Sequence, residues 1–274
     1  MANSKFLFSP SPRSRDTGRP MTRCGVQWHA PYAPTELEQF DGTWRLAGCP
    51  ACLWEAVNNS PVGSKEYREG HAEFEAEALN RRLIATGITP RFRGCTFDTF
   101  STDGELAGPK SSALAACREY AEAFEDHVKI GRGLLLLGGV GTGKTHLACA
   151  IAQHAVRTFE AWAVVTSAAE ICRVMRGSFG KGATYTEADV LEELAGPDLL
   201  VIDEIGVQSA SDFSPGVLSD VIDRRYQHLR PTILVSNRTA LELSRFIGDR
   251  AVDRMRQGGG RVVGFHWASA RGDQ

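Results

Sequence analysis

The chain has 274 residues, of which 42% are hydrophobic and 23% charged, and its formal net charge at pH 7 is -2. This length fits one sizeable domain with a smaller second one. A near-neutral charge excludes a uniformly basic surface, so any contact with DNA must come from a local patch. The sequence holds no continuous apolar run of membrane-spanning length. Seven scattered cysteines exclude a regular disulfide framework and favour a cytoplasmic protein that does not enter a membrane.

Composition divides the chain into three sections. Residues 1–20 are rich in Ser, Pro and Arg and have only a short apolar core at 6–8, which predicts a disordered basic arm rather than a secretory signal. Residues 21–86 form a small section rich in Cys, Trp and Pro. Residues 87–274 alternate between strand and helix patterns, which is typical of an α/β fold.

The small section contains one well-marked helix. Ser64 is a suitable N-cap, the helix is expected to run to about Ala85, and Gly87 provides a stop. One face carries Tyr67, His71, Phe74 and Ala78, and the glutamates 66, 69, 73 and 77 lie largely off that face. Two interpretations remain open: a surface helix packed on one side, or a docking helix for a partner protein.

The large section is expected to form a parallel sheet. Its strand candidates are almost fully apolar and lie between helices, which indicates a sheet covered on both faces. The predicted strands are 134–137, 161–167, 198–203, 232–237 and 261–267. The predicted helices are 111–130, 144–158, 168–176, 186–195 and 216–229.

Residues 138–145, GGVGTGKT, match the pattern G-x-x-x-x-G-K-[ST] between a predicted strand and a predicted helix. Glycines allow backbone N–H groups to curl around phosphates, and the helix that follows directs its positive end at them. Lys144 would reach the β and γ phosphates, and the Thr145 hydroxyl would bind Mg²⁺. The expected nucleotide contacts are Gly138, Gly141, Gly143, Lys144 and Thr145.

Two further strand ends complete this expected site. Asp203 ends a buried strand, where a carboxylate is costly unless it meets a cation such as hydrated Mg²⁺. Glu204 is placed to orient or deprotonate an attacking water, and Asn237 at the tip of the next strand can position that water or sense the γ-phosphate. No N-K-x-D motif for guanine occurs, so the sequence predicts an ATPase.

The last section is rich in arginine. Arg250 and Arg254 are four residues apart and share one helical face. An arginine on a short helix far from its own phosphate loop can reach the ATP of a neighbouring subunit, although a solvated basic face would have the same pattern. The chain ends a few residues after the fifth predicted strand, so no helical lid domain is expected there.

From residue 87 onward the chain resembles the DnaC/IstB group of AAA+ ATPases. The resemblance rests on the lidless ending, a PRF…C-x-F segment at 90–97, the SNR strand end at 236–238 and a GDR-xx-DR box at 248–254. It implies an AAA+ P-loop core that self-associates, with Arg250 as the arginine finger. It also implies that Arg271 contacts nucleotide, although Ala270 stands where the family has tyrosine.

The small section carries metal-ligand spacing. Cys49 and Cys52 form a C-x₂-C pair, and Cys24 with His29 supplies two more ligands for a tetrahedral Zn²⁺ site. Bound zinc would stabilise a section too small for a large core. His71 or Cys95 could replace one ligand, or the thiols could simply be buried. Phage and prophage helicase loaders look similar here.

The resemblance implies a helicase loader. Residues 21–86 would grip a hexameric DnaB-type helicase, and residues 87–274 would bind ATP and single-stranded DNA. An IstB-like helper of a transposase is the nearest alternative. A small-molecule kinase and a zinc-dependent DNA-binding regulator are alternatives from other classes.

Single-stranded DNA requires basic side chains and aromatic faces. Residues 172–185, CRVMRGSFGKGATY, offer both in a glycine-rich segment after the second strand, although an ordinary surface loop would look the same. The expected DNA contacts are Arg173, Arg176, Phe179, Lys181 and Tyr185.

Overall fold

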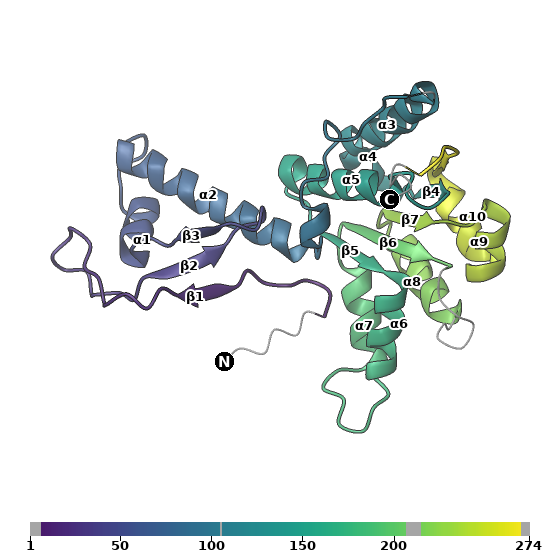
Figure 1. Cartoon of the computed structure of the whole chain (residues 1–274). Helices are drawn as coiled ribbons and strands as arrows, with labels where there is room; N and C mark the ends of the chain where they lie inside the picture. Colours follow the sequence, from purple (N-terminus) through teal and green to yellow (C-terminus); the bar gives the residue numbers. More distant parts are fainter. Residues whose placement is uncertain (1–6, 105, 207–214, 270–274) are drawn as a thin grey trace. The chain divides into compact units, whose positions relative to one another are not determined.

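The computed structural model describes residues 7–104, 106–206 and 215–269 (Figure 1). These residues form two compact units. The small unit is Pro10–Ala85. The large unit comprises residues 7–9 together with the described residues from Thr86 on, and it is called the ATPase unit because it carries the motifs of the predicted ATPase. Within the described part of the chain, no helix is both long and apolar enough to cross a membrane.

The ATPase unit is built on a five-stranded sheet in the order β5-β6-β7-β4-β8, and every pair is parallel. All five strands predicted from the sequence are present. This order places the carboxyl ends of β4, β6 and β7 side by side, which is where an open α/β sheet binds its ligand. The strands are β4 Leu134–Gly138, β5 Ala163–Ser167, β6 Leu199–Ile205, β7 Thr232–Ser236 and β8 Arg261–Phe265.

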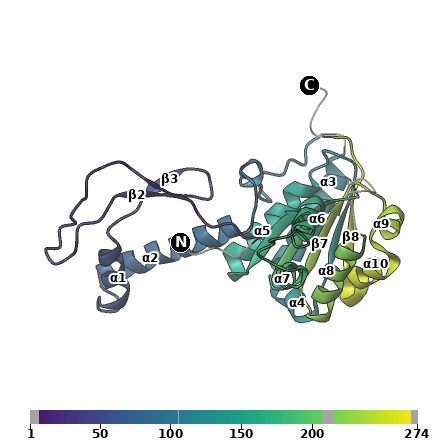
Figure 2. The same ribbon diagram turned by 90° about the horizontal axis from the view of Figure 1, so that it is seen from below.

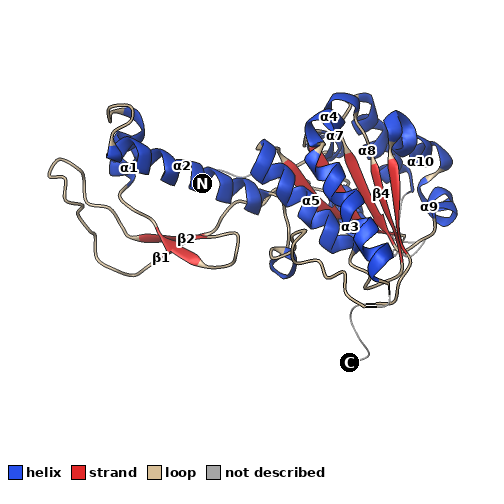
Figure 3. Ribbon diagram, turned by 90° about the horizontal axis from the view of Figure 1, so that it is seen from above, coloured by secondary structure: helices blue, strands red, loops and turns tan. Residues whose placement is uncertain are grey.

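Helices cover both faces of the sheet (Figure 3). The expected helix over 111–130 is in fact two helices, because the chain turns at Ala123 and thereby buries both Tyr120 and Phe124. No glycine or proline marks that break, so tertiary packing decides it. The helices are α3 Ala107–Glu122, α4 Phe124–Ile130, α5 Lys144–Phe159, α6 Ala168–Gly177, α7 Glu187–Ala195, α8 Pro215–Gln227, α9 Ala240–Ile247 and α10 Asp249–Arg256, with 3-10 turns at Pro90–Phe92 and Gln257–Gly259.

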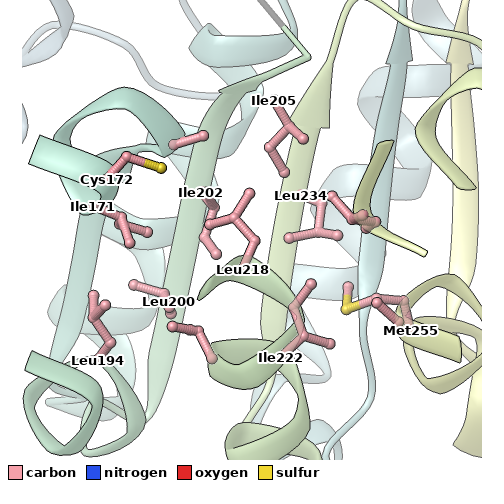
Figure 4. Close-up of a cluster of buried hydrophobic side chains, with 14 of the residues drawn as sticks. Ile171, Cys172, Leu194, Leu200, Ile202, Ile205, Leu218, Ile222, Leu234 and Met255 are labelled. Carbon is pink, nitrogen blue, oxygen red and sulfur yellow. The ribbon is translucent and has the colours of Figure 1, made fainter. Parts of the chain in front are cut away.

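Alternate residues of β4, β6 and β7 face opposite sides of the sheet. Leu200 and Leu234 pack against α6 to α10 (Figure 4), Leu135 belongs to the same cluster, and their neighbours along the strands face the layer that contains α3 and α5. Each fully buried side chain of this kind contributes about 1.5–3 kcal/mol. Figure 1 shows the sheet between these two helical layers, and Figure 2 views the same unit from the side of α6, α7 and α8. The large apolar core therefore holds the strand ends rigidly in place.

A buried arginine fixes one edge of this core. Arg225 on α8 is fully buried, and its guanidinium donates to backbone carbonyls near the end of α7 and before β7. Burial lowers its pKa to about 9. Its acceptors are the carbonyl oxygens of Leu194, Ala195, Pro197 and Pro231 and the hydroxyl of Thr232.

The small unit combines a three-stranded antiparallel sheet with two helices. Its elements are β1 Ser14–Asp16, β2 Thr35–Glu38, β3 Trp44–Leu46, α1 Pro50–Asn58 and α2 Lys65–Ala85. The helix predicted from Ser64 to Ala85 is confirmed as α2, and the Ser64 hydroxyl accepts from the Tyr67 N–H at 3.1 Å.

Part of the segment predicted to be a disordered arm is ordered. Phe8 packs into the core of the ATPase unit. Residues 14–16 form β1 of the small unit, where Arg15 lies 4.2 Å over the Trp44 ring and Arg13 pairs with Glu38. The sequence predicts a disordered basic arm here, whereas each of these arginines contacts a carboxylate or an aromatic ring.

The small unit has little apolar core. Helix α1 buries no side chain completely, and Phe40, Leu83 and Ile84 are among the few large apolar residues that are buried in this unit. Gly70 of α2 meets α1 so closely that an added Cβ would lie 2.4 Å from the Cβ of Ala56. The face of α2 that contacts α1 is therefore the face that carries the glutamates. Phe74, on the aromatic face, is 46% exposed.

Candidate functional site: nucleotide pocket and Cys/His cluster

The loop between β4 and α5 requires its glycines. Gly141 and Gly143 have φ values of 75° and 91°, which side chains other than glycine rarely adopt. A Cβ at Gly138 would lie 2.2 Å from the carbonyl oxygen of Phe265, and one at Gly143 would lie 2.6 Å from the Phe100 ring. The loop thus has the tight backbone curvature that binds phosphate through N–H groups.

Lys144 lies inside this loop. Its side chain is 5% exposed, and its ammonium donates to the carbonyl oxygen of Gly138 at 2.8 Å and to that of Gly139. The loop therefore holds a buried cation beside its N–H groups, and both features favour an anionic ligand.

Thr145 and Asp203 are joined directly. The Thr145 hydroxyl donates to Oδ2 of Asp203 at 2.7 Å, and Oδ1 accepts from the Glu204 N–H at 2.7 Å. Burial raises the pKa of Asp203, and these two hydrogen bonds oppose that rise. A hydroxyl and a carboxylate at this distance are the oxygen ligands that Mg²⁺ takes in such sites, so the residues fit the ion.

Glu204 and Asn237 line the same pocket as the phosphate loop and Asp203. The pocket has a volume of about 250 Å³. Glu204 adopts a left-handed φ of 58° where β6 and β7 shift register, a conformation that costs about 1–2 kcal/mol. Strained backbone of this kind is concentrated at functional sites.

Sequence reasoning missed several residues at this pocket. Arg91, Phe92 and Cys95 line it, although the sequence presents all three only within a family-like segment and Cys95 also as an alternative zinc ligand. Trp267, just after β8, is buried, and its indole N–H donates to the Thr142 carbonyl at 3.0 Å. Nothing in the sequence indicated that this tryptophan reaches the loop.

The arginines of the last section have different surroundings in the structure. Arg254 pairs with Asp223 of its own chain and lies 5.4 Å over the Tyr226 ring. Arg250 is exposed at the start of α10 and does not line the described pocket. Arg271 lies outside the described residues. Arg254 is therefore structural, and Arg250 alone of the pair is open to a neighbouring molecule.

The expected DNA-binding segment is partly used for packing. Phe179 is 67% exposed, and Arg176 and Lys181 are exposed beside it. Arg173 pairs with Glu170 on α6. Tyr185 packs against the core, and its hydroxyl donates to the Val174 carbonyl at 3.2 Å, so its ring is not a free stacking surface.

The structure brings the four candidate zinc ligands together. Their ligand atoms all lie within 4.8 Å of one another. Nδ1 of His29 is 3.2 Å from Sγ of Cys24, 3.3 Å from Sγ of Cys52 and 3.8 Å from Sγ of Cys49. Tetrahedral zinc with these ligands sets edges of about 3.5–3.8 Å. The donor set and spacing fit Zn²⁺, and neither His71 nor Cys95 belongs to the cluster.

A second layer of contacts orients this cluster. Nε2 of His29 lies 3.0 Å from Oε1 of Glu55, which also accepts from the Trp28 indole N–H at 3.1 Å. A carboxylate behind a histidine ligand fixes the ring and its tautomer in metal sites. Cys49 and Cys52 stand at the start of α1, where the helix dipole favours thiolates. Glu55 was not predicted from the sequence.

Comparison with known proteins fixes the family. Residues 120–255 match the family described as IstB-like ATP binding protein. The replicative helicase loader DnaC of Escherichia coli K12 is 33% identical over 199 residues, which are 73% of this chain and 78% of that protein. This chain belongs to the DnaC/IstB-like family of AAA+ ATPases. The resemblance inferred from the sequence is thereby confirmed, and nucleotide binding follows at the level of the family.

Other relatives agree. DnaC of Buchnera aphidicola from Acyrthosiphon pisum is 32% identical over 73% of this chain and 78% of its own length, and the uncharacterised YdaV of E. coli K12 is 30% identical over 76% and 84%. A crystal structure of the DnaC helicase loader superposes with a TM-score of 0.55 at 21% identity, covering 65% of this chain and 99% of that one. A DnaA initiator structure gives 0.52 at 24%, covering 66% and 51%. These structural likenesses support the AAA+ fold alone.

Proposed function

We propose that this protein is an ATP-dependent loader that delivers a hexameric DnaB-type replicative helicase to single-stranded DNA in the cytoplasm. The observation that carries the proposal is the pocket that joins Thr145, Asp203, Glu204 and Asn237 in a chain that aligns with most of DnaC. We assign helicase binding to residues 21–86 and ATP turnover to residues 87–274.

In this account, the nucleotide pocket hydrolyses ATP. Lys144 leaves the loop carbonyls and binds the β and γ phosphates. Thr145 and Asp203 would hold Mg²⁺, and the ion would supply positive charge against the phosphates. Glu204 orients the attacking water and takes its proton, and Asn237 holds that water near the γ-phosphate. Arg271 adds a nucleotide contact from the end of the chain.

Arg250 completes the site of a neighbouring subunit. It is exposed and does not line the described pocket of its own chain, so it is free to approach a second copy. An arginine supplied in trans raises turnover only when subunits are aligned. ATP hydrolysis therefore depends on self-association. The turnover rate then increases with the number of loader subunits that are correctly aligned on the helicase.

The other two parts have separate roles. Cys24, His29, Cys49 and Cys52 would hold a structural Zn²⁺ that stabilises the small unit, because three cysteines and one histidine would close the coordination shell without an open catalytic position. Single-stranded DNA binds the segment after β5 through Arg176, Phe179 and Lys181, with Arg173 and Tyr185 supporting that segment.

A loading assay tests the proposal. Circular single-stranded DNA coated with single-strand-binding protein resists the helicase alone, so strand separation of an annealed oligonucleotide reports loading. Strand separation that requires this protein and ATP is the expected result. The absence of any effect with the cognate helicase would refute the loader function.

The IstB-like match supports a second candidate, an ATPase that assists a transposase. That protein would bind duplex DNA rather than a helicase. Duplex-stimulated ATP turnover without any helicase binding would favour this candidate over the loader.

A further inference from the structure

The small unit contains a groove that the proposed function has not yet used. The groove has a volume of about 650 Å³ and lies between α1, α2, strand β2 and the segment that follows β3. Its apolar lining includes Leu37 from β2 and Leu53 and Ala56 from α1. Figure 1 shows α1 beside the first half of α2. A groove with this lining can accept a row of side chains from a segment of another polypeptide.

Every charged residue that lines the groove is a glutamate. The five are Glu55, Glu66, Glu69, Glu73 and Glu77. The last four recur every three or four residues along α2, so they form one stripe along the groove. This stripe is the row of glutamates that the sequence places off the aromatic face of the helix.

The two ends of this stripe differ. At the inner end, Arg45 donates to Glu73 at 3.1 Å and to Glu77 at 2.6 Å, so these carboxylates already have a cation. At the outer end, Glu66 and Glu69 are exposed, and among the described residues the ion pair at this end is that of Lys65 with Glu69, at 3.8 Å. Negative charge therefore remains at the end of the groove that is closest to the start of α2.

We propose that this groove binds a basic amphipathic segment of the helicase. Its apolar residues would cover Leu37, Leu53 and Ala56, and its lysines or arginines would pair with Glu66 and Glu69. This inference rests on the loader function proposed above and names the surface that carries it. Nucleic acid is excluded as the occupant, because phosphates would face a row of carboxylates.

The metal cluster and the groove share residues. Cys49 and Cys52 line the groove as well as the cluster, and both lie at the start of α1. Zinc on these thiolates would fix the α1 wall, and Gly70 would keep that wall against α2. Metal binding and partner binding are thus linked through the position of one short helix.

Charge reversal tests the groove. The affinity of the full chain for the cognate helicase is measured with the double variant Glu66→Lys/Glu69→Lys, with Glu66→Lys alone and with Glu75→Lys. Glu75 is exposed on the same helix and does not line the groove, so Glu75→Lys matches the single reversal in charge and helix position. Zinc content and ADP affinity show that each variant is folded.

We expect the double variant to lose at least about tenfold in affinity, Glu66→Lys to lose less, and Glu75→Lys to bind like the parent chain. The neutral pair Glu66→Gln/Glu69→Gln should bind with an intermediate affinity and a weaker salt dependence. If the folded double variant bound the helicase like the parent chain, the proposed role of the groove would be refuted while the loader function remained intact. Failure of the parent chain to bind would overturn both.

Discussion

The two units of this protein are stabilised in different ways. The ATPase unit buries nearly all of β4 and β7, most of β6 and one face of most helices, whereas the small unit buries few large apolar residues and relies on ion pairs, cation–π contacts and a Cys/His cluster. A nucleotide switch needs strand ends fixed to fractions of an ångström, which a large core supplies. A partner-binding unit can instead be held by a metal. The contrast predicts that the two units respond to different perturbations.

The largest expected effect is the unfolding of the small unit when its metal is removed. Structural zinc contributes about 10 kcal/mol or more in small domains, so a chelator or Cys52→Ser should unfold residues 10–85. Nucleotide affinity of the ATPase unit should stay unchanged. Metal analysis should give one zinc per chain, and hydrogen exchange should show protection lost only in the small unit. Retained protection there after complete chelation would contradict the contrast.

The matching perturbation of the ATPase unit is Arg225→Met. It leaves several buried carbonyl oxygens without donors, and we expect a loss of about 3–5 kcal/mol in the free energy of unfolding. Denaturant unfolding monitored in the ATPase unit measures this loss. Arg224→Met is the control, because Arg224 is the adjacent exposed residue. Equal stability of the two variants would show that the buried arginine is dispensable.

A third test separates binding from chemistry in the nucleotide pocket. Glu204→Gln should keep ATP affinity within about twofold and lower turnover by about 10²–10³-fold, because it removes the base and preserves the shape. Radiolabelled ATP turnover with a parallel ADP titration distinguishes the two. A large loss of affinity with unchanged turnover of bound ATP would assign Glu204 a binding role.

A smaller effect is expected at the end of β8. Trp267→Phe preserves an aromatic ring in the core but removes the N–H donor to the Thr142 carbonyl. We expect ADP to bind about three- to tenfold more weakly, as for the loss of one buried hydrogen bond. Trp162→Phe, near the opposite ends of the strands, should leave ADP affinity unchanged. Equal affinity in both variants would show that Trp267 does not position the loop.

The smallest effect concerns pH. Burial lowers the pKa of His127 on α4 to about 4, and its side chain is 3% exposed. The unfolded chain takes up a proton near pH 6.5 while the folded chain does not, so stability should fall as pH drops from about 6.5 toward 4. In His127→Phe, the melting temperature of the ATPase unit should depend less on pH across this window. An unchanged dependence would assign it to other groups.

Residues of the site that belong to a local sequence motif could be predicted. Residues that reach the site from a distant part of the chain could not. The phosphate loop, Asp203 and Asn237 follow from motif and strand ends, because parallel strands bring those ends together. The four candidate zinc ligands were proposed from their spacing, and the structure decides between them and the alternatives His71 and Cys95. Glu55 behind His29 was not predictable, because charge and position along the chain do not identify which exposed-looking side chain folds back onto another segment.

The same reasoning explains the misread elements. Tyr185 looks like a DNA-stacking residue in sequence, yet its ring fills a gap beside α6. The turn at Ala123 has no helix breaker, and only the burial of residues on both sides accounts for it. Periodicity gives the identity of each element, whereas packing decides where elements bend and which aromatic rings remain free.

The most direct test of the whole account is light scattering after size exclusion, with the full chain mixed with its cognate DnaB-type helicase in the presence and absence of ATP. The account predicts a stable complex heavier than the helicase hexamer whose stability changes with ATP, and loss of that complex after zinc is removed. Elution of the helicase alone under every condition would contradict the account.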